Sequence, residues 1–274
     1  MVNTYKTLNN GVKMPALGLG VYKSGGDTKQ AVLDALAAGY RHIDTAALYK
    51  NEAQVAQAIK ESGIPREEIF ITTKLWNDDM KNGTQLEAFE RSLKLLETDY
   101  VDLYLIHWPV SCALEQSWKI LEQIYKEGRA RAIGVSNCHM EHLMRILAVA
   151  AVVPAVNQVE AHPYLSQKPL KTFCNHLSIE MEAWSPLGRG QVLDDPVIKE
   201  LAKKYKKTPA QIVLRWELEE NWIVIPKSVH KERIEENSKI FDFELESCDR
   251  TALEQLNNNR HFGTSPDNFE NKQW

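Results

Sequence analysis

Four side chains suited to acid–base chemistry stand near the ends of short apolar runs in the first half of the sequence. Asp44, Lys74 and His107 each follow such a run directly, and Tyr49 lies in the segment just after Asp44. Short apolar runs are typical of buried strands. In a barrel of parallel strands, the C-terminal strand ends open onto one face, where such folds place their active sites. We therefore predict that these four residues, the catalytic quartet, form one site.

The chemistry expected of this quartet is proton donation to an oxygen atom. A free phenol has a pKa of about 10 and gives up its proton poorly at neutral pH. An ammonium group about 4 Å away contributes roughly 4 kcal/mol at an effective dielectric of about 20. Lys74 would then lower the pKa of Tyr49 by about one to three units after desolvation, and Asp44 would keep Lys74 charged. His107 would orient the substrate oxygen. Such an acid suits carbonyl reduction, with a nicotinamide cofactor supplying the hydride.

Each of these residues also has a purely structural interpretation. Asp44 could cap a helix, Lys74 could be a surface lysine, Tyr49 could be a packing residue, and His107 could be a hydrogen-bonded core histidine. Three of the four recur at the ends of successive predicted strands, and that recurrence favours the active-site interpretation.

A metal site is a further alternative. His42 and Asp44 share one side of their strand because side chains alternate along a strand, and His107 or His162 could complete a ligand set. The sequence has no compact zinc-binding spacing. We therefore expect no metal.

An alternation of strands and helices would position the quartet. The expected strands cover residues 16–20, 41–43, 69–73, 101–106, 130–135, 155–159, 179–184 and 222–226, and the expected helices cover residues 27–38, 51–62, 84–96, 114–126, 139–150, 168–177, 196–206, 209–218, 231–240 and 249–256. Alternating strands and helices indicate a parallel sheet. Eight such strands close into a barrel filled by its own side chains.

The fold class predicted is therefore α/β, a (β/α)8 TIM barrel with extra C-terminal helices, in one domain spanning residues 1–274. An N-terminal hairpin, turning at Asn9-Asn10-Gly11, would plug the barrel bottom. The alternative is an open doubly wound sheet, which normally carries its dinucleotide on a Gly-x-Gly-x-x-Gly turn. Both Gly18-Leu19-Gly20 and Gly188-Arg189-Gly190 lack the third glycine.

Composition narrows the class of protein further. The 274 residues are 43% hydrophobic and 26% charged, which is ordinary for a globular chain. A net charge of −4 with mixed signs argues against nucleic acid as a partner.

No apolar run approaches the roughly 20 residues that span a bilayer, and the N-terminal segment 1–6 has no apolar signal core, so we expect a cytoplasmic protein and no membrane partner. The four cysteines are expected to be free thiols. We also expect a monomer.

Several ordered motifs resemble those of the aldo-keto reductase family. They are Gly39-Tyr40-Arg41-His42-Ile43-Asp44-Thr45-Ala46, Thr73-Lys74-Leu75-Trp76-Asn77, Leu105-Ile106-His107-Trp108-Pro109, Ile133-Gly134-Val135-Ser136-Asn137 and Ile225-Pro226-Lys227-Ser228. The resemblance covers nearly the whole chain. It is greatest for the bacterial branch that includes diketogluconate reductases, and for similar prostaglandin F synthases of protozoa.

The resemblance implies an NADPH-dependent carbonyl reductase with Tyr49 as proton donor. It also implies a set of cofactor-binding residues: Gly20, Val21, Ser136, Asn137, Gln158, Trp184, Ser185, Leu187, Lys227, Ser228, Val229, Arg233, Glu236 and Asn237. Within this set, Ser136, Asn137 and Gln158 would hold the nicotinamide carboxamide and Trp184 would stack on its ring. Glu236 and Asn237 would lie beside the adenine.

The 2′-phosphate of NADP would bind at Lys227, Ser228 and Arg233. A helix is expected to begin near this segment, and helix N-termini attract anions. The guanidinium of Arg233 adds a bidentate fork for phosphate. A solvated basic face is the alternative. The arrangement favours NADP over NAD.

The substrate pocket implied by the resemblance is lined by Tyr22, Trp76, His107 and Trp108. Small dicarbonyls, keto sugars or keto acids, and aromatic aldehydes are the expected substrates. The loop over residues 110–116 is short, which predicts an open pocket. The alternative function is a dinucleotide-binding sensor or regulatory subunit on the same barrel, with little turnover. The intact quartet argues against this sensor.

Overall fold

A closed ring of parallel strands forms the centre of the molecule in the computed structural model, which describes residues 4–271. The strands are β3 (Leu19–Gly20), β4 (His42–Asp44), β5 (Phe70–Leu75), β6 (Val101–Ile106), β7 (Ala130–Ser136), β8 (Val156–Glu160), β9 (Glu180–Trp184) and β10 (Ile223–Val224). They pair in sequence order in one eight-stranded sheet. Parallel bridges of Leu17 with Val224 and of Gly20 with Lys227 join the last strand to the first. The predicted barrel is confirmed.

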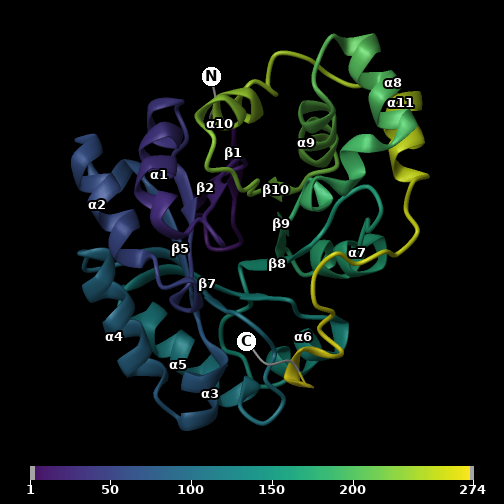
Figure 1. Cartoon of the computed structure of the whole chain (residues 1–274). Coiled ribbons are helices and arrows are strands. Elements are labelled where there is room, and N and C mark those ends of the chain that lie inside the picture. Colours follow the sequence, from purple (N-terminus) through teal and green to yellow (C-terminus); the bar gives the residue numbers. More distant parts are fainter. Residues whose placement is uncertain (1–3, 272–274) are drawn as a thin grey trace.

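Helices surround this ring on its outside (Figure 1). They are α1 (Thr28–Ala37), α2 (Glu52–Ser62), α3 (Asn77–Asn82), α4 (Gln85–Leu96), α5 (Leu114–Lys126), α6 (Met140–Leu147), α7 (Lys168–His176), α8 (Pro196–Tyr205), α9 (Pro209–Glu219), α10 (Lys231–Ser238) and α11 (Ser247–Glu254). All of the expected helices are present. The short polar helix α3, directly after Trp76, was not expected.

The N-terminal hairpin consists of the antiparallel strands β1 (Tyr5–Thr7) and β2 (Lys13–Pro15). Leu8 and Met14 are buried against side chains that point into the barrel, including Phe70, Leu103 and Ile223. The hairpin therefore closes the N-terminal end of the barrel, as predicted.

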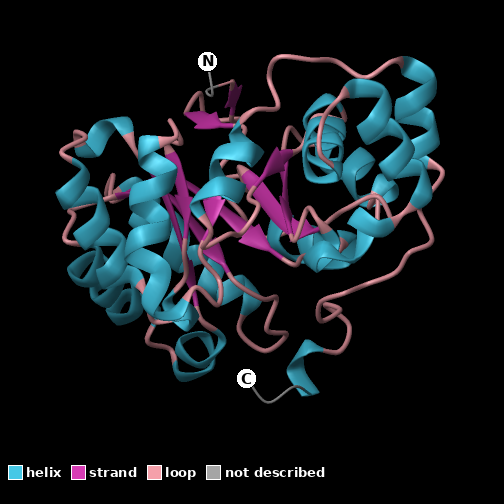
Figure 2. Cartoon of the chain, turned by 45° about the horizontal axis from the view of Figure 1, so that its top comes forward, coloured by secondary structure: helices cyan, strands magenta, loops and turns pink. Residues whose placement is uncertain are grey.

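The C-terminal tail, residues 257–271, leaves α11 and runs along one side of the barrel to a final turn, η5 (Phe269–Asn271) (Figures 1 and 2). Residues 1–3 belong to the N-terminal segment that was expected to lack a signal core, and residues 272–274 end the C-terminal tail. Both lie outside the described residues. Of the helices in the described part of the chain, none has the length and apolar character that crossing a membrane requires. All four cysteines are free, as expected.

Candidate active site

A buried ion pair lies at the C-terminal end of β4 and β5. The Nζ of Lys74 donates to both Asp44 carboxylate oxygens at 2.7 Å each and to the Thr45 carbonyl at 2.9 Å. Lys74 is 0% exposed and Asp44 is 2% exposed. Burial raises the pKa of the Asp44 carboxyl, whereas the Lys74 ammonium and a hydrogen bond from Gln158 oppose that rise. The predicted pairing of Lys74 with Asp44 is therefore present.

A tight turn after β4 positions Tyr49. The turn η2 (Ala47–Tyr49) ends at Lys50, which has a left-handed φ of 55°. Asn51 then fixes the loop, because it accepts a hydrogen bond from Thr45 Oγ1 at 2.7 Å and donates to the Val21 carbonyl at 3.0 Å. These bonds tie the loop to the strand ends on both sides.

The quartet residues come together with two of the predicted pocket residues. The Nζ of Lys74 lies 5.1 Å from the centroid of the Tyr49 ring. The Tyr49 ring lies 4.9 Å from the Tyr22 ring and 5.6 Å from the His107 ring, centroid to centroid. Trp76 packs edge-on against His107 at 5.2 Å. An acid, an amine, a phenol and an imidazole thus occupy one aromatic-walled site.

The pKa of Tyr49 differs from the sequence-based expectation. Burial raises the pKa of the phenol well above its usual value, and the nearby Asp44 carboxylate raises it further. The expected lowering of this pKa is wrong for this structure, because burial is the largest influence on the phenol. Tyr49 therefore keeps its proton at neutral pH.

His107 is a neutral imidazole. Burial and the nearby Lys74 charge hold its pKa well below the usual range. Its Nδ1 is buried and has no hydrogen-bond partner among the described residues. The neutral ring can therefore carry its proton on Nε2 and donate it in a hydrogen bond.

The residues predicted to hold the nicotinamide lie at neighbouring ends of β7, β8 and β9. Asn137, with a left-handed φ of 59°, donates to the His107 carbonyl at 3.0 Å and accepts from Trp184 Nε1 at 2.8 Å. Ser136 Oγ donates to the Gln158 backbone carbonyl at 2.8 Å. Asn137 therefore fixes the orientation of the partly exposed Trp184 ring.

Gln158 contacts two acids at once. Its Nε2 donates to Asp44 Oδ2 at 2.7 Å and to Glu182 Oε2 at 2.8 Å. Sequence reasoning missed Glu182, which is 0% exposed on β9. The available signal was its position two residues before Trp184, on the same side of the strand.

The residues predicted to bind the 2′-phosphate lie in the first turn of α10 or in the segment just before it. Lys227 and Arg233 are exposed, and Ser228 is buried and accepts the His230 backbone N–H at 3.1 Å. The helix α10 begins at Lys231, close to all three. Two positive side chains and a helix N-terminus therefore share one surface, as an anionic phosphate requires.

The remaining predicted cofactor residues have mixed environments. Glu236 accepts a hydrogen bond from Thr208 Oγ1 at 2.8 Å, and this bond links α10 to the start of α9. Asn237 and Val21 are buried, and Val21 N–H donates to the Asp44 carbonyl at 3.1 Å. Gly20 ends β3, and Ser185, Leu187 and Val229 lie in loops after strand ends.

The tail contributes a cover that loop length did not predict. Phe269 stacks on Trp108 with centroids 5.1 Å apart and an interplanar angle of 18°. Glu270 accepts the Ser111 N–H at 2.8 Å, on the short loop itself. The tail therefore contacts both Trp108 and the short loop, and the openness of the pocket stays a prediction.

Glu160 at the end of β8 anchors the tail. It accepts the backbone N–H groups of Phe262 and Gly263 at 2.9 Å each and lies 3.1 Å from His261 Nδ1. Gly263 rests on the edge of Trp184, where a Cβ atom would approach the ring to 2.3 Å. A side chain at position 263 would therefore displace Trp184.

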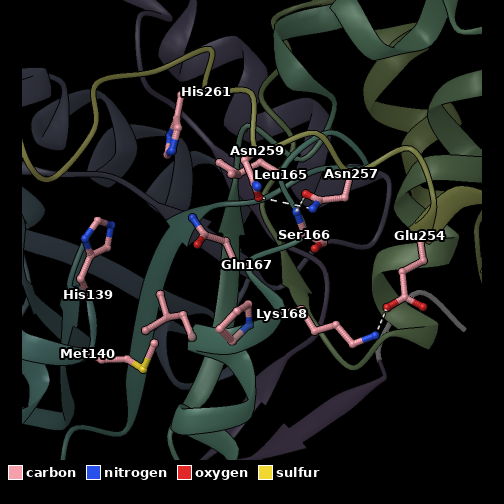
Figure 3. A pocket seen from close by; sticks show the side chains of 12 residues that line it. His139, Met140, Leu165, Ser166, Gln167, Lys168, Glu254, Asn257, Asn259 and His261 are labelled. Carbon is pink, nitrogen blue, oxygen red and sulfur yellow. Dashed lines mark hydrogen bonds and ion pairs between the residues drawn. The ribbon is translucent and has the colours of Figure 1, made fainter.

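A cavity of about 600 Å³ lies outside the quartet. It lies between the starts of α6 and α7 and the tail, with His139, Gln167 and His261 on its walls (Figure 3). Lys168 and Glu254 form an ion pair across its rim (Figure 3). A small cavity next to it touches Asn137 and Trp184.

His42 does not join the metal group considered above. Its ring lies inside the barrel against Gly18, with Nε2 3.2 Å from Thr72 Oγ1, and burial and Lys74 lower its pKa to about 3. Within residues 4–271, the ligand atoms close enough to share an ion belong to two other groups: His139, Glu141 and Asp267, and Glu246, Cys248 and Asp249.

Comparisons with known proteins identify the family of this chain. The model of the aldo/keto reductase family matches residues 16–258. The chain is 50% identical over 262 residues to glyoxal reductase of Bacillus subtilis, covering 95% of each protein. It is 48% identical over 268 residues to 9,11-endoperoxide prostaglandin H2 reductase of Trypanosoma cruzi, covering 96% of this chain and 95% of that one. The structure of a Bombyx mori aldo-keto reductase in complex with NADP matches with a TM-score of 0.90 at 38% identity, covering 98% of this chain and 97% of that one.

Proposed function

Because this chain belongs to the aldo/keto reductase family, we propose that it reduces aldehydes and reactive ketones to alcohols with NADPH, with Tyr49 as the proton donor. The observation that supports this most directly is the buried Lys74–Asp44 pair beside the Tyr49 ring. A buried ion pair is costly to desolvate and contributes little to stability for its cost. A catalytic role for Tyr49 explains why this ion pair lies against the phenol ring.

When bound, NADPH would supply the hydride. The neutral His107 would donate a hydrogen bond from Nε2 to the carbonyl oxygen and so orient the carbonyl. Tyr49 holds its proton at neutral pH because its pKa is raised. An alkoxide is a stronger base than a phenolate, so proton transfer from Tyr49 to the newly formed alkoxide is downhill. Lys74 would then stabilise the phenolate that remains.

The two ends of the proposed cofactor site fit the two ends of NADPH. Gln158 has a side-chain oxygen with no hydrogen-bond partner among the described residues, and such an acceptor suits the amide group of a nicotinamide. Trp184 offers a partly exposed ring for stacking. Lys227 and Arg233 would bind the 2′-phosphate, which NADH lacks.

Small dicarbonyls are the substrate class we favour. A relative that is 50% identical over 95% of both chains is named for its action on glyoxal. The walls of the site are aromatic, from Tyr22, Trp76 and His107, with Trp108 beside them under Phe269. Such walls suit compact, flat carbonyl compounds around one fixed oxygen position. We propose that the chain acts as one domain and as a monomer.

The test is a kinetic screen that follows loss of NADPH absorbance with glyoxal, methylglyoxal, an aromatic aldehyde and a keto acid. NADPH and NADH are compared in parallel, and cofactor binding is measured separately by fluorescence. We expect the highest kcat/KM with the dicarbonyls and NADPH. Binding of NADPH without turnover of any carbonyl would contradict the proposal and would favour a cofactor-binding sensor.

A further inference from the structure

A second buried acid lies beneath the site, on β9, and the mechanism above does not use it. Glu182 is 0% exposed, and its Oε2 accepts Gln158 Nε2 at 2.8 Å. Its Oε1 is also buried and has no hydrogen-bond partner among the described residues, and His42 Nε2 lies 3.6 Å from it. A buried carboxyl with one bonded and one unbonded oxygen calls for an explanation, since leaving buried polar atoms unpaired is costly.

The first consequence concerns the orientation of the Gln158 amide. Both of its N–H groups point at acids, to Asp44 Oδ2 at 2.7 Å and to Glu182 Oε2 at 2.8 Å. The Asp44 carboxylate cannot donate, so the reversed amide would place the Gln158 oxygen against an acceptor. Asp44 Oδ2 and the accepting Glu182 Oε2 therefore hold the nitrogen inward, and Oε1 of Gln158 accepts no hydrogen bond from the described residues.

The second consequence concerns charge. The groups that face Glu182 are Asp44 and His42 from β4, Lys74 from β5 and the Tyr49 phenol from η2. Lys74 is already neutralised by Asp44 at 2.7 Å, and the pKa of His42 is lowered to about 3, so no cation remains for a second carboxylate. Burial and the Asp44 charge raise the pKa of Glu182 to about 8. Glu182 therefore holds a proton at neutral pH.

We propose that Glu182 is a positioning residue that, with Asp44, sets the amide orientation of Gln158 and so presents the Gln158 oxygen to the carboxamide of the nicotinamide cofactor. This inference rests on the cofactor site proposed above. It gives β9 two functions, because Trp184 at its end offers the stacking ring while Glu182 orients the hydrogen-bonding partner on β8.

The test compares two substitutions of Glu182. In Glu182→Met, the side chain keeps its length but loses the acceptor, so one Gln158 N–H is unpaired and Asp44 alone holds the amide orientation. We expect the Kd for NADPH to rise about tenfold, or about 1.4 kcal/mol. In Glu182→Gln, an amide oxygen still accepts from Gln158 and the amide nitrogen takes the place of the Oε1 atom that faces His42. We expect its Kd to stay within about twofold of the wild type.

A double-mutant cycle separates positioning from simple loss of stability. In a Gln158→Met background, the change Glu182→Met should leave the Kd for NADPH unchanged, because the residue through which it acts is gone. Thermal melting of all four proteins shows whether each is folded. The proposal is overturned if Glu182→Met binds NADPH like the wild type, if Glu182→Gln loses as much affinity as Glu182→Met, or if the effect of Glu182→Met persists without Gln158.

The binding readout also separates this inference from the proposed function. If wild-type protein binds NADPH but reduces no carbonyl, the proposed reaction fails while the role of Glu182 is still measured by fluorescence. If wild-type protein does not bind NADPH, the proposed cofactor site fails and the role of Glu182 toward it fails with it.

Discussion

The two ends of the proposed cofactor site are built in opposite ways. At the nicotinamide end, Lys74, Asp44 and Gln158 are all at most 2% exposed and bonded to one another. At the phosphate end, Lys227 and Arg233 are exposed side chains near the start of a helix. One end is a fixed network inside the barrel and the other is a charged surface.

The difference follows from what each end must do. Chemistry at the carbonyl needs charges that are already oriented and shielded from water, where they act most strongly. Capture of a phosphate needs positive charge that a solvated ligand can reach, at the cost of screening by salt. We therefore expect substitutions at the buried end to affect turnover and folding, and substitutions at the exposed end to affect cofactor choice.

The largest effect is expected at Tyr49. Tyr49→Phe removes the proposed acid while keeping the ring against Tyr22 and His107, so kcat should fall by about 10²–10⁴-fold, the usual contribution of a general acid. NADPH affinity should change little. Steady-state kinetics and fluorescence titration measure the two quantities.

The matched control is Tyr22→Phe, which removes a hydroxyl from the neighbouring ring, 40% exposed at the edge of the site. The kcat of this variant should stay within about threefold of the wild type, because the Tyr22 hydroxyl does not transfer a proton in the proposed reaction. Equal losses in the two variants would remove Tyr49 from its assigned role.

The next effect is on folding. Lys74→Met leaves the Asp44 carboxylate buried without its cation, which typically costs about 3–5 kcal/mol of unfolding free energy. Chemical denaturation measures this cost. The control Lys60→Met breaks the exposed pair with Glu97, whose side chains are 79% and 58% exposed, and should cost at most about 1 kcal/mol. A Lys74→Met protein as stable as the control would mean that the buried pair is not the organising feature of this end.

A smaller effect is expected in the pH dependence of stability. The pKa of Glu182 rises from 4.5 to about 8 on folding. Between these values the folded chain holds a proton that the unfolded chain has lost, so Glu182 makes stability fall as pH rises from about 4.5 to about 8. Glu182→Gln has no such proton. The Tm of this variant minus the Tm of the wild type should therefore increase as pH rises through this interval. A constant difference in Tm across the interval would show that Glu182 does not titrate there.

The smallest effect is expected at the exposed end. Arg233→Ala should weaken NADPH binding by about tenfold, leave NADH binding unchanged, and reduce the salt dependence of NADPH affinity. Lys239→Ala, an exposed cation at the far end of α10, is the control and should leave both affinities unchanged. Equal weakening of NADPH and NADH by Arg233→Ala would mean that this side chain does not contact the 2′-phosphate.

Much of the fold was predictable because its signals are local. Apolar runs of strand length and the positions of Gly39, Gly63 and Gly128, each with a left-handed φ at a helix end, mark the alternation that defines the barrel. The convergence of Asp44, Lys74 and His107 followed from the rule that parallel strand ends share one face.

What could not be predicted depends on contacts between distant segments. The role of Glu182 depends on Gln158 and Asp44, which belong to other strands, and no spacing in the sequence connects the three. The raised pKa of Tyr49 depends mainly on burial among neighbours from distant segments, whereas the sequence indicated only which charged groups would lie near it. The cover that Phe269 places on Trp108 joins residues 161 positions apart in the chain, and only the folded structure brings them together.

The most direct test of the account is the fate of the hydrogen at C4 of the cofactor. NADPH deuterated at both C4 positions is incubated with the protein and methylglyoxal, and the alcohol product is analysed by mass spectrometry. The account predicts one deuterium on the carbinol carbon, with the hydroxyl proton coming from the protein and exchanging with water. A product without deuterium at that carbon would contradict it.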